Sequence, residues 1–127
     1  MKFYGYHHIG LFVEDVERSL AFYKKLGGTI VFDFPMSDTG DTIYLVDLGG
    51  NAVVEIIPKG QGGPQENARW RHIALSTDDV RAAYALALEA GAVSQSEPQD
   101  VQLGTMSVYN SFVVGPDGEV IEFFQTK

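Results

Sequence analysis

The chain has 127 residues, 45% of them hydrophobic, which fits a single globular domain spanning 1–127. Its formal net charge of −8 argues against nucleic acid and anionic membranes, which both need a basic surface. Because cysteine is absent, any metal would be bound by histidine, carboxylate or water. We expect no signal peptide and no membrane-spanning segment, and therefore a cytoplasmic protein.

The first half of the sequence predicts a strand, a helix and three further strands. Residues 4–13 are rich in aromatic and β-branched side chains, which favours a strand. Asp15 is a candidate N-cap for a helix whose apolar stripe runs to the stop signal at Gly27. The three strands that follow are expected at 29–34, 42–48 and 52–57, with a hairpin turn at 49–51.

The second half predicts the same order after a Gly- and Pro-rich linker at 59–69. Asp78 or Asp79 would cap a helix that ends near Ala90. The strands are expected at 70–77, 92–96, 106–114 and 119–125, with a polar connection at 97–103 and a turn at Pro116-Asp117-Gly118.

The two halves also repeat each other in sequence. His8-Ile9-Gly10-Leu11 returns as His72-Ile73-Ala74-Leu75, and Val54-Glu55-Ile56 returns as Ile121-Glu122-Phe123. Each copy has too little sequence to bury both faces of its sheet alone. We therefore predict an α+β fold of two tandem βαβββ modules, 4–58 and 70–127, which form a cupped, partly open mixed β-sheet barrel with the helices outside.

Each copy carries a histidine near its start and a glutamate near its end. A single strand histidine is more often structural, and a single strand glutamate often faces solvent. Equivalent placement in both copies favours a shared role, because carboxylates among apolar residues are costly to bury without a partner. Two imidazoles and two carboxylates suit one divalent transition metal, Ni, Zn, Mn, Co or Fe. The predicted ligands are His8, Glu55, His72 and Glu122.

These motifs resemble the vicinal oxygen chelate superfamily, which contains glyoxalase I, bleomycin-resistance proteins and extradiol dioxygenases. The resemblance rests on residues 8–13, on Val54-Glu55-Ile56, on residues 72–75 and on residues 112–123. It implies that the four predicted ligands bind the metal, in the pattern of bacterial glyoxalase I. It also implies a homodimer, because such relatives often build each site from two subunits.

The expected activity is that of a metal-dependent lyase or isomerase of glyoxalase I type. Its substrate would be a small α-carbonyl compound or hemithioacetal, which reacts through a metal-bound enediolate. Glu122 is the first choice for the general base and Glu55 the second. Glyoxalase I has an Arg and an Asn for glutathione where this chain has Phe12 and Lys59, so the thiol is left open. The alternatives are a dioxygenase, a thiol transferase, or a metal-free protein that binds a drug or metabolite.

Other residues are weaker candidates for the site. His7 is expected on the opposite face of its strand from His8, in a structural or surface role. Several large side chains would be core residues by default and pocket walls otherwise: Tyr6, Phe12, Phe34, Tyr44, Trp70, Met106 and Tyr109.

Overall fold

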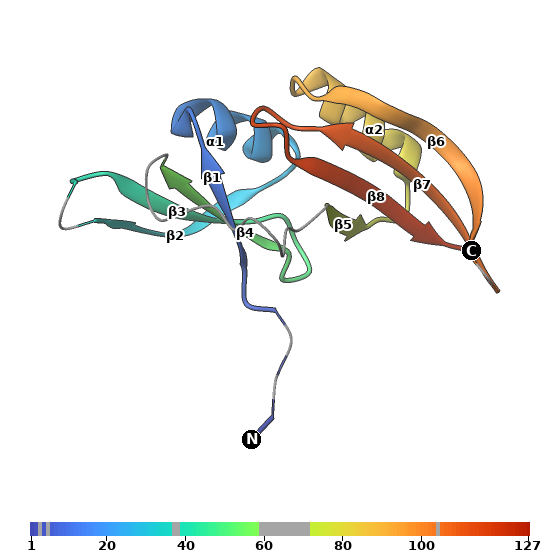
Figure 1. Cartoon of the computed structure of the whole chain (residues 1–127), viewed down its shortest axis with the longest axis horizontal. Helices are drawn as coiled ribbons and strands as arrows, with labels where there is room; N and C mark the ends of the chain where they lie inside the picture. Colours follow the sequence, from blue (N-terminus) through green and yellow to red (C-terminus); the bar gives the residue numbers. More distant parts are fainter. Residues whose placement is uncertain (3, 5, 37–38, 59–71, 104) are drawn as a thin grey trace, which may run out of the picture. The chain divides into compact units, whose positions relative to one another are not determined.

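The computed structural model describes residues 1–2, 4, 6–36, 39–58, 72–103 and 105–127 (Figure 1). The chain divides into two compact units, Met1–Gly63 and Pro64–Lys127. Each unit has the order β-α-β-β-β and contains one four-stranded sheet, which confirms the α+β class and the two-module prediction. The linker expected at 59–69 lies outside the described residues.

Unit 1 is a mixed sheet with one helix on it (Figure 1). Its strand order is β1-β4-β3-β2, with β1 parallel to β4 and the other pairs antiparallel. Its helix contacts β3 and β4, and the side chains of Val46, Val54 and Ile56 are buried. The elements are β1 (Ile9–Val13), α1 (Val16–Lys25), β2 (Thr29–Pro35), β3 (Thr42–Asp47) and β4 (Val53–Pro58).

Unit 2 repeats this arrangement, with the strand order β5-β8-β7-β6 and β5 parallel to β8. Its helix contacts β6, β7 and β8, so one face of the sheet is covered and carries the buried Val113, Ile121 and Phe123. The elements are β5 (Ile73–Ser76), α2 (Val80–Glu89), β6 (Val93–Leu103), β7 (Met106–Val114) and β8 (Val120–Thr126).

Both helices begin at an aspartate and end before a glycine. The carboxylates of Asp15 and Asp79 accept hydrogen bonds from the backbone N–H groups of Arg18 (3.1 Å) and Ala82 (2.9 Å). Asp79 rather than Asp78 is therefore the cap of α2. The helix before Gly91 stops there because the glycine has a φ of 107°, which residues with a Cβ rarely adopt. The predicted helix starts are confirmed.

The prediction for residues 92–103 is wrong in one respect. The polar connection expected at 97–103 is the continuation of β6, which pairs with β7 as far as Leu103 and Met106. Its register shifts between Ser96 and Gln99, and Pro98 lies in that irregularity. Proline is tolerated there because β6 is an edge strand and a shifted residue need not donate to the ladder.

Two other strands are shorter than expected. The first strand was predicted from residue 4 but β1 begins at Ile9, and β5 begins at Ile73. His8 and His72 therefore each lie one residue before the strand that positions them. In the described part of the chain, no helix is long and apolar enough to cross a membrane.

Candidate functional site

In unit 1, His8 and Glu55 form a pair. The Nε2 atom of His8 lies 3.6 Å from Oε1 of Glu55. The pair forms because β1 runs parallel to β4 with Gly10 directly opposite Glu55, and His8 is two residues before Gly10. A Cβ atom at Gly10 would lie 3.4 Å from Glu55 Oε1 and 3.2 Å from Ile57 Cδ1. The glycine thus leaves space beside the carboxylate.

In unit 2, His72 and Glu122 form the equivalent pair. The Nε2 atom of His72 lies 3.2 Å from Oε2 of Glu122, and the parallel pairing of β5 with β8 puts Ala74 opposite Glu122. The structure thus brings together the predicted site residues of each unit, two and two, at equivalent places of the repeat.

The second pair has neighbours that the sequence analysis missed. The amide Nδ2 of Asn110 on β7 donates a hydrogen bond to Oε1 of Glu122 at 2.9 Å, and both residues are buried. The ring of Phe112, which lies opposite Glu122 in the β7–β8 register, meets the His72 ring edge-on at 5.5 Å. Glu122 is therefore held by an amide, while an aromatic ring packs against its histidine.

Apolar residues take these places in unit 1. Leu45 lies opposite Glu55, as Phe112 lies opposite Glu122. Ile43, two residues before Leu45, is the counterpart of Asn110, and its side chain cannot donate a hydrogen bond. The Glu55 side chain is also more exposed, at 18% against 8% for Glu122. The two pairs therefore differ in how firmly the carboxylate is held.

The place of His7 differs from the expectation. Its Nδ1 lies 2.9 Å from Nδ1 of His8, and the two rings meet edge-on. Both residues precede β1, so the alternation of side chains along a strand does not separate them. One imidazole donates to the other, and His7 is a direct partner of His8 rather than a residue on the far face.

The aromatic residues for which the sequence left the core or a pocket wall open divide between the two faces of the sheets. In unit 1, Phe12 and Phe34 are exposed, and so is Phe32, which pairs with Leu45 in the row that contains Glu55. These three rings give the Glu55 side of the sheet an apolar surface.

Tyr44 and Tyr109, for which the core was the default and a pocket wall the alternative, lie away from the glutamates. Tyr44 pairs with the buried Ile56, which is next to Glu55 in the strand, so Tyr44 faces the opposite side of the sheet from Glu55. Arg81 of α2 lies over the ring of Tyr109, with its guanidinium carbon 5.2 Å from the ring centroid. Both tyrosines therefore belong to the helix-covered faces, and neither is a wall of the site. Trp70 and Lys59 lie outside the described residues. The remaining two, Tyr6 and Met106, are exposed.

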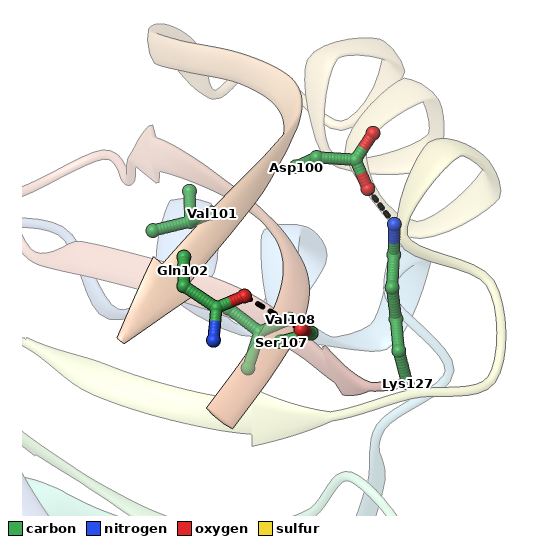
Figure 2. A pocket seen from close by; sticks show the side chains of 6 residues that line it. All are labelled: Asp100, Val101, Gln102, Ser107, Val108 and Lys127. Carbon is green, nitrogen blue, oxygen red and sulfur yellow. Dashed lines mark hydrogen bonds and ion pairs between the residues drawn. The ribbon is translucent and has the colours of Figure 1, made fainter. Parts of the chain in front are cut away.

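A pocket of about 270 Å³ lies in unit 2, where β6 and β7 meet the last residue, Lys127 (Figure 2). Figure 2 shows two polar contacts across it: an ion pair between Lys127 and Asp100, and a 2.6 Å hydrogen bond that Ser107 Oγ donates to Gln102 Oε1. The two charged side chains of the pocket, Lys127 and Asp100, are therefore paired with each other. The lining contains none of the predicted ligands, so the pocket does not mark the histidine–glutamate chemistry.

The spacing of the two pairs is close to that of two ligands on one divalent metal. Two ligands of one ion, with bonds of about 2.0–2.2 Å, lie roughly 3.0–3.5 Å apart. The nearest imidazole nitrogen and carboxylate oxygen lie 3.2 Å apart in the His72–Glu122 pair, inside that range, and 3.6 Å apart in the His8–Glu55 pair, just beyond it. Among the described residues of either unit, no three His, Asp or Glu side chains form a metal-binding group. Each unit, taken by itself, therefore brings together two of the four predicted ligands.

The chain belongs to the glyoxalase/bleomycin resistance protein/dioxygenase superfamily, whose sequence model matches residues 5–123. It is 33% identical over 124 residues to the uncharacterized protein YwbC of Bacillus subtilis, covering 93% of this chain and 94% of that one. It is 29% identical over 125 residues to a probable lactoylglutathione lyase of Vibrio cholerae, covering 94% and 89%. These matches extend over nearly the whole chain and place it among glyoxalase-like proteins.

The fold is shared with solved structures of the superfamily. The glyoxalase family protein from Enterococcus faecalis superposes with a TM-score of 0.75 at 20% sequence identity, covering 98% of this chain and 99% of that one. Members of the superfamily include glyoxalase-like enzymes, and they commonly use a divalent metal.

Proposed function

We propose that the protein is a metal-dependent lyase or isomerase of glyoxalase I type that acts on a small α-carbonyl compound or hemithioacetal. The observation that carries this proposal is the pairing of His8 with Glu55 and of His72 with Glu122 at equivalent places of a repeated module. Independent structural accidents would not be expected to produce the same pair twice, and the distances of 3.2 and 3.6 Å lie in or close to the range for two ligands of one ion.

The four side chains would hold one divalent transition metal. When bound, such an ion supplies Lewis acidity to two vicinal oxygens of a substrate, which makes the neighbouring C–H bond more acidic. The chain itself has to remove that proton. Glu55 and Glu122 are the carboxylates within reach of such a substrate, and either can accept a proton at one oxygen and return it to the adjacent carbon.

The surroundings of Glu55 also suggest a substrate class. Phe12, Phe32 and Phe34 are exposed on the side of the sheet that carries Glu55. Phenylalanine side chains bind apolar groups and offer no charge-assisted bond to a carboxylate. We therefore favour α-hydroxycarbonyl compounds or thiol adducts whose substituent beyond the reacting carbons is apolar, over an adduct of an anionic thiol.

The first test is elemental analysis of the purified protein after incubation with Ni, Zn, Mn, Co or Fe(II). We expect about one ion for each pair of wild-type units, and its loss in the His8→Ala and His72→Ala variants. Glu89→Gln is the matched control, because Glu89 ends the helix on the covered face of the sheet. Metal-loaded protein is then assayed with methylglyoxal and a series of small thiols, and with free α-hydroxycarbonyls.

The competing activities give different results in the same assays. Oxygen consumption that requires Fe(II) would indicate a ring-cleaving dioxygenase, and loss of thiol without isomerisation would indicate a thiol transferase. Wild-type protein that binds none of the five metals, yet binds apolar ligands with an affinity that His8→Ala leaves unchanged, would refute the proposal and identify a binding protein.

A further inference from the structure

The buried amide of Asn110 is the feature that separates the two histidine–glutamate pairs. The residue is 5% exposed, and its Nδ2 donates to Glu122 Oε1 at 2.9 Å. Its Oδ1 is also buried, and among the described residues it has no hydrogen-bond partner. The carboxylate fixes the orientation of the amide, because only the NH₂ end can donate to it. A buried oxygen without a partner lowers stability, so packing alone does not explain an asparagine here.

The effect of this amide on Glu122 is to fix the carboxylate at both ends. Oε1 is bound by Asn110, and Oε2 faces the Nε2 of His72 at 3.2 Å. If a carboxylate were both a metal ligand and the general base, it would have to release the metal to accept the proton and then bind again. Turning Glu122 would break a buried, charge-assisted hydrogen bond, which is among the stronger contacts in a protein interior.

Glu55 is free of that constraint. The counterpart of Asn110 in unit 1 is Ile43, which cannot donate to the carboxylate. The residue opposite Glu55 across the parallel strands is Gly10, where the equivalent residue opposite Glu122 is Ala74. Glu55 therefore has an apolar neighbour in place of an amide, and a glycine in place of a residue with a methyl group.

Resting on the proposed function, we propose that Asn110 is a positioning residue that keeps Glu122 as a fixed metal ligand and leaves Glu55 as the general base. The carboxylate of Glu55 takes the proton from the carbon beside the carbonyl. The electron pair of that C–H bond forms the C=C bond of an enediolate, and the carbonyl π electrons move to its oxygen. Return of the proton to the neighbouring carbon, together with transfer of the hydroxyl proton from the first oxygen to the second, leaves the carbonyl on the carbon that was deprotonated, and no other reactant is consumed. This assignment reverses the order of the two glutamates that the sequence favours.

The experiment compares Glu55→Gln, Glu122→Gln and Asn110→Leu, with Ile43→Leu as the control at the equivalent position of unit 1. Two quantities are measured on each full-length protein: the metal dissociation constant, and the exchange of the substrate α-proton with deuterated water by NMR. The probe is the α-hydroxycarbonyl or hemithioacetal that the wild type turns over best. Exchange is measured at saturating metal, so that weaker metal binding and lost base function are separated.

We expect Glu55→Gln to keep the metal within about tenfold and to lose α-proton exchange by about 100-fold or more. Glu122→Gln and Asn110→Leu should raise the metal dissociation constant by about 10- to 100-fold and retain exchange within about tenfold once metal is saturating. The control should change neither quantity. A merely structural asparagine would lower the melting temperature in Asn110→Leu without moving the metal dissociation constant.

Two results would overturn the assignment while leaving the proposed function intact. One is a Glu122→Gln protein that holds metal as the wild type does but no longer exchanges the proton. The other is an Asn110→Leu protein, folded by its melting curve, with wild-type metal affinity. The comparison of the two glutamine variants decides the question even if Asn110→Leu does not fold. A wild-type protein without metal or exchange would instead overturn the proposed function.

Discussion

Gly10 lies directly opposite Glu55 in the parallel pairing of β1 with β4, and a Cβ atom there would be 3.4 Å from the Oε1 of Glu55. In unit 2 the same place opposite Glu122 is filled by Ala74. The repeat therefore offers a matched pair of substitutions, Gly10→Ala and Ala74→Gly, each of which gives one glutamate the strand neighbour of the other.

We predict that Gly10→Ala lowers kcat by about tenfold while the protein keeps its fold and its metal. The added methyl group would make ordinary contact with the carboxylate and a tighter one, 3.2 Å, with the flexible end of Ile57, so the side chains can adjust. It would nevertheless crowd the Glu55 carboxylate and restrict the movement that a general base needs, so kcat should fall more than metal affinity. The measurement is steady-state kinetics together with a metal titration.

Ala74→Gly is the control for that prediction. It removes a methyl group beside Glu122, which Asn110 still holds, so kcat should stay within about threefold of wild type. Equal losses of kcat in the two variants would mean that the space beside Glu55 has no special role.

The sequence repeat was enough to predict the four histidine and glutamate residues of the site. It did not reveal directly that the surroundings of Glu55 and Glu122 differ. His8, Glu55, His72 and Glu122 stand out in the sequence because each type recurs at an equivalent place. The importance of Asn110 depends on the register of β7 against β8, which puts Phe112 opposite Glu122. The turn at residues 116–118 could have predicted this register. Counting an equal number of residues away from the turn along each strand pairs Phe112 with Glu122.

A second prediction concerns the start of α2. Asp79→Ala should destabilise the protein by about 1 kcal/mol, because it removes the acceptor for the Ala82 backbone N–H at 2.9 Å. In a domain of this size that loss corresponds to a fall of about 4 °C in melting temperature. The neighbouring Asp78→Ala is the control and should leave the melting temperature within about 1 °C, since the cap is Asp79. A larger loss in Asp78→Ala than in Asp79→Ala would contradict the assignment of the cap.

The strands show where local sequence patterns stop being sufficient. The hairpin turns and helix starts are set by residues next to each other, and they were predicted correctly. The extension of β6 through Pro98 depends on its pairing with β7, which is a non-local interaction. For Tyr44 and Tyr109, residue type alone predicted the core by default and left a pocket wall as the alternative. The strand pairing shows that each tyrosine faces the opposite side of its sheet from the glutamate.

A third prediction concerns the pocket in Figure 2, which contains the Asp100–Lys127 ion pair. Lys127→Ala should leave turnover and metal content unchanged, because the pocket is lined by residues other than the histidine–glutamate pairs. It should also cost less than about 1 kcal/mol of stability, since both charged side chains are largely exposed and solvent screens them. Kinetics and urea unfolding test both statements. A tenfold loss of kcat would show that the pocket takes part in the reaction.

The last prediction concerns which units share a metal. If the protein is a homodimer whose sites combine unit 1 of one chain with unit 2 of its partner, two inactive variants should complement each other. The first variant is His8→Ala/Glu55→Gln, and the second is His72→Ala/Glu122→Gln. After mixing, unfolding and refolding in equal amounts, half of the dimers are mixed, and each mixed dimer has one site with all four ligands.

We therefore expect the refolded mixture to recover about a quarter of the wild-type activity and metal content, whereas either variant refolded alone recovers none. Sites formed within a single chain would give no recovery in the mixture, because every chain then lacks one of its two pairs. Size-exclusion chromatography of the same samples at micromolar concentration provides the second measurement. A monomeric wild-type protein that still binds its metal would rule out the shared arrangement and place both pairs of ligands in one chain.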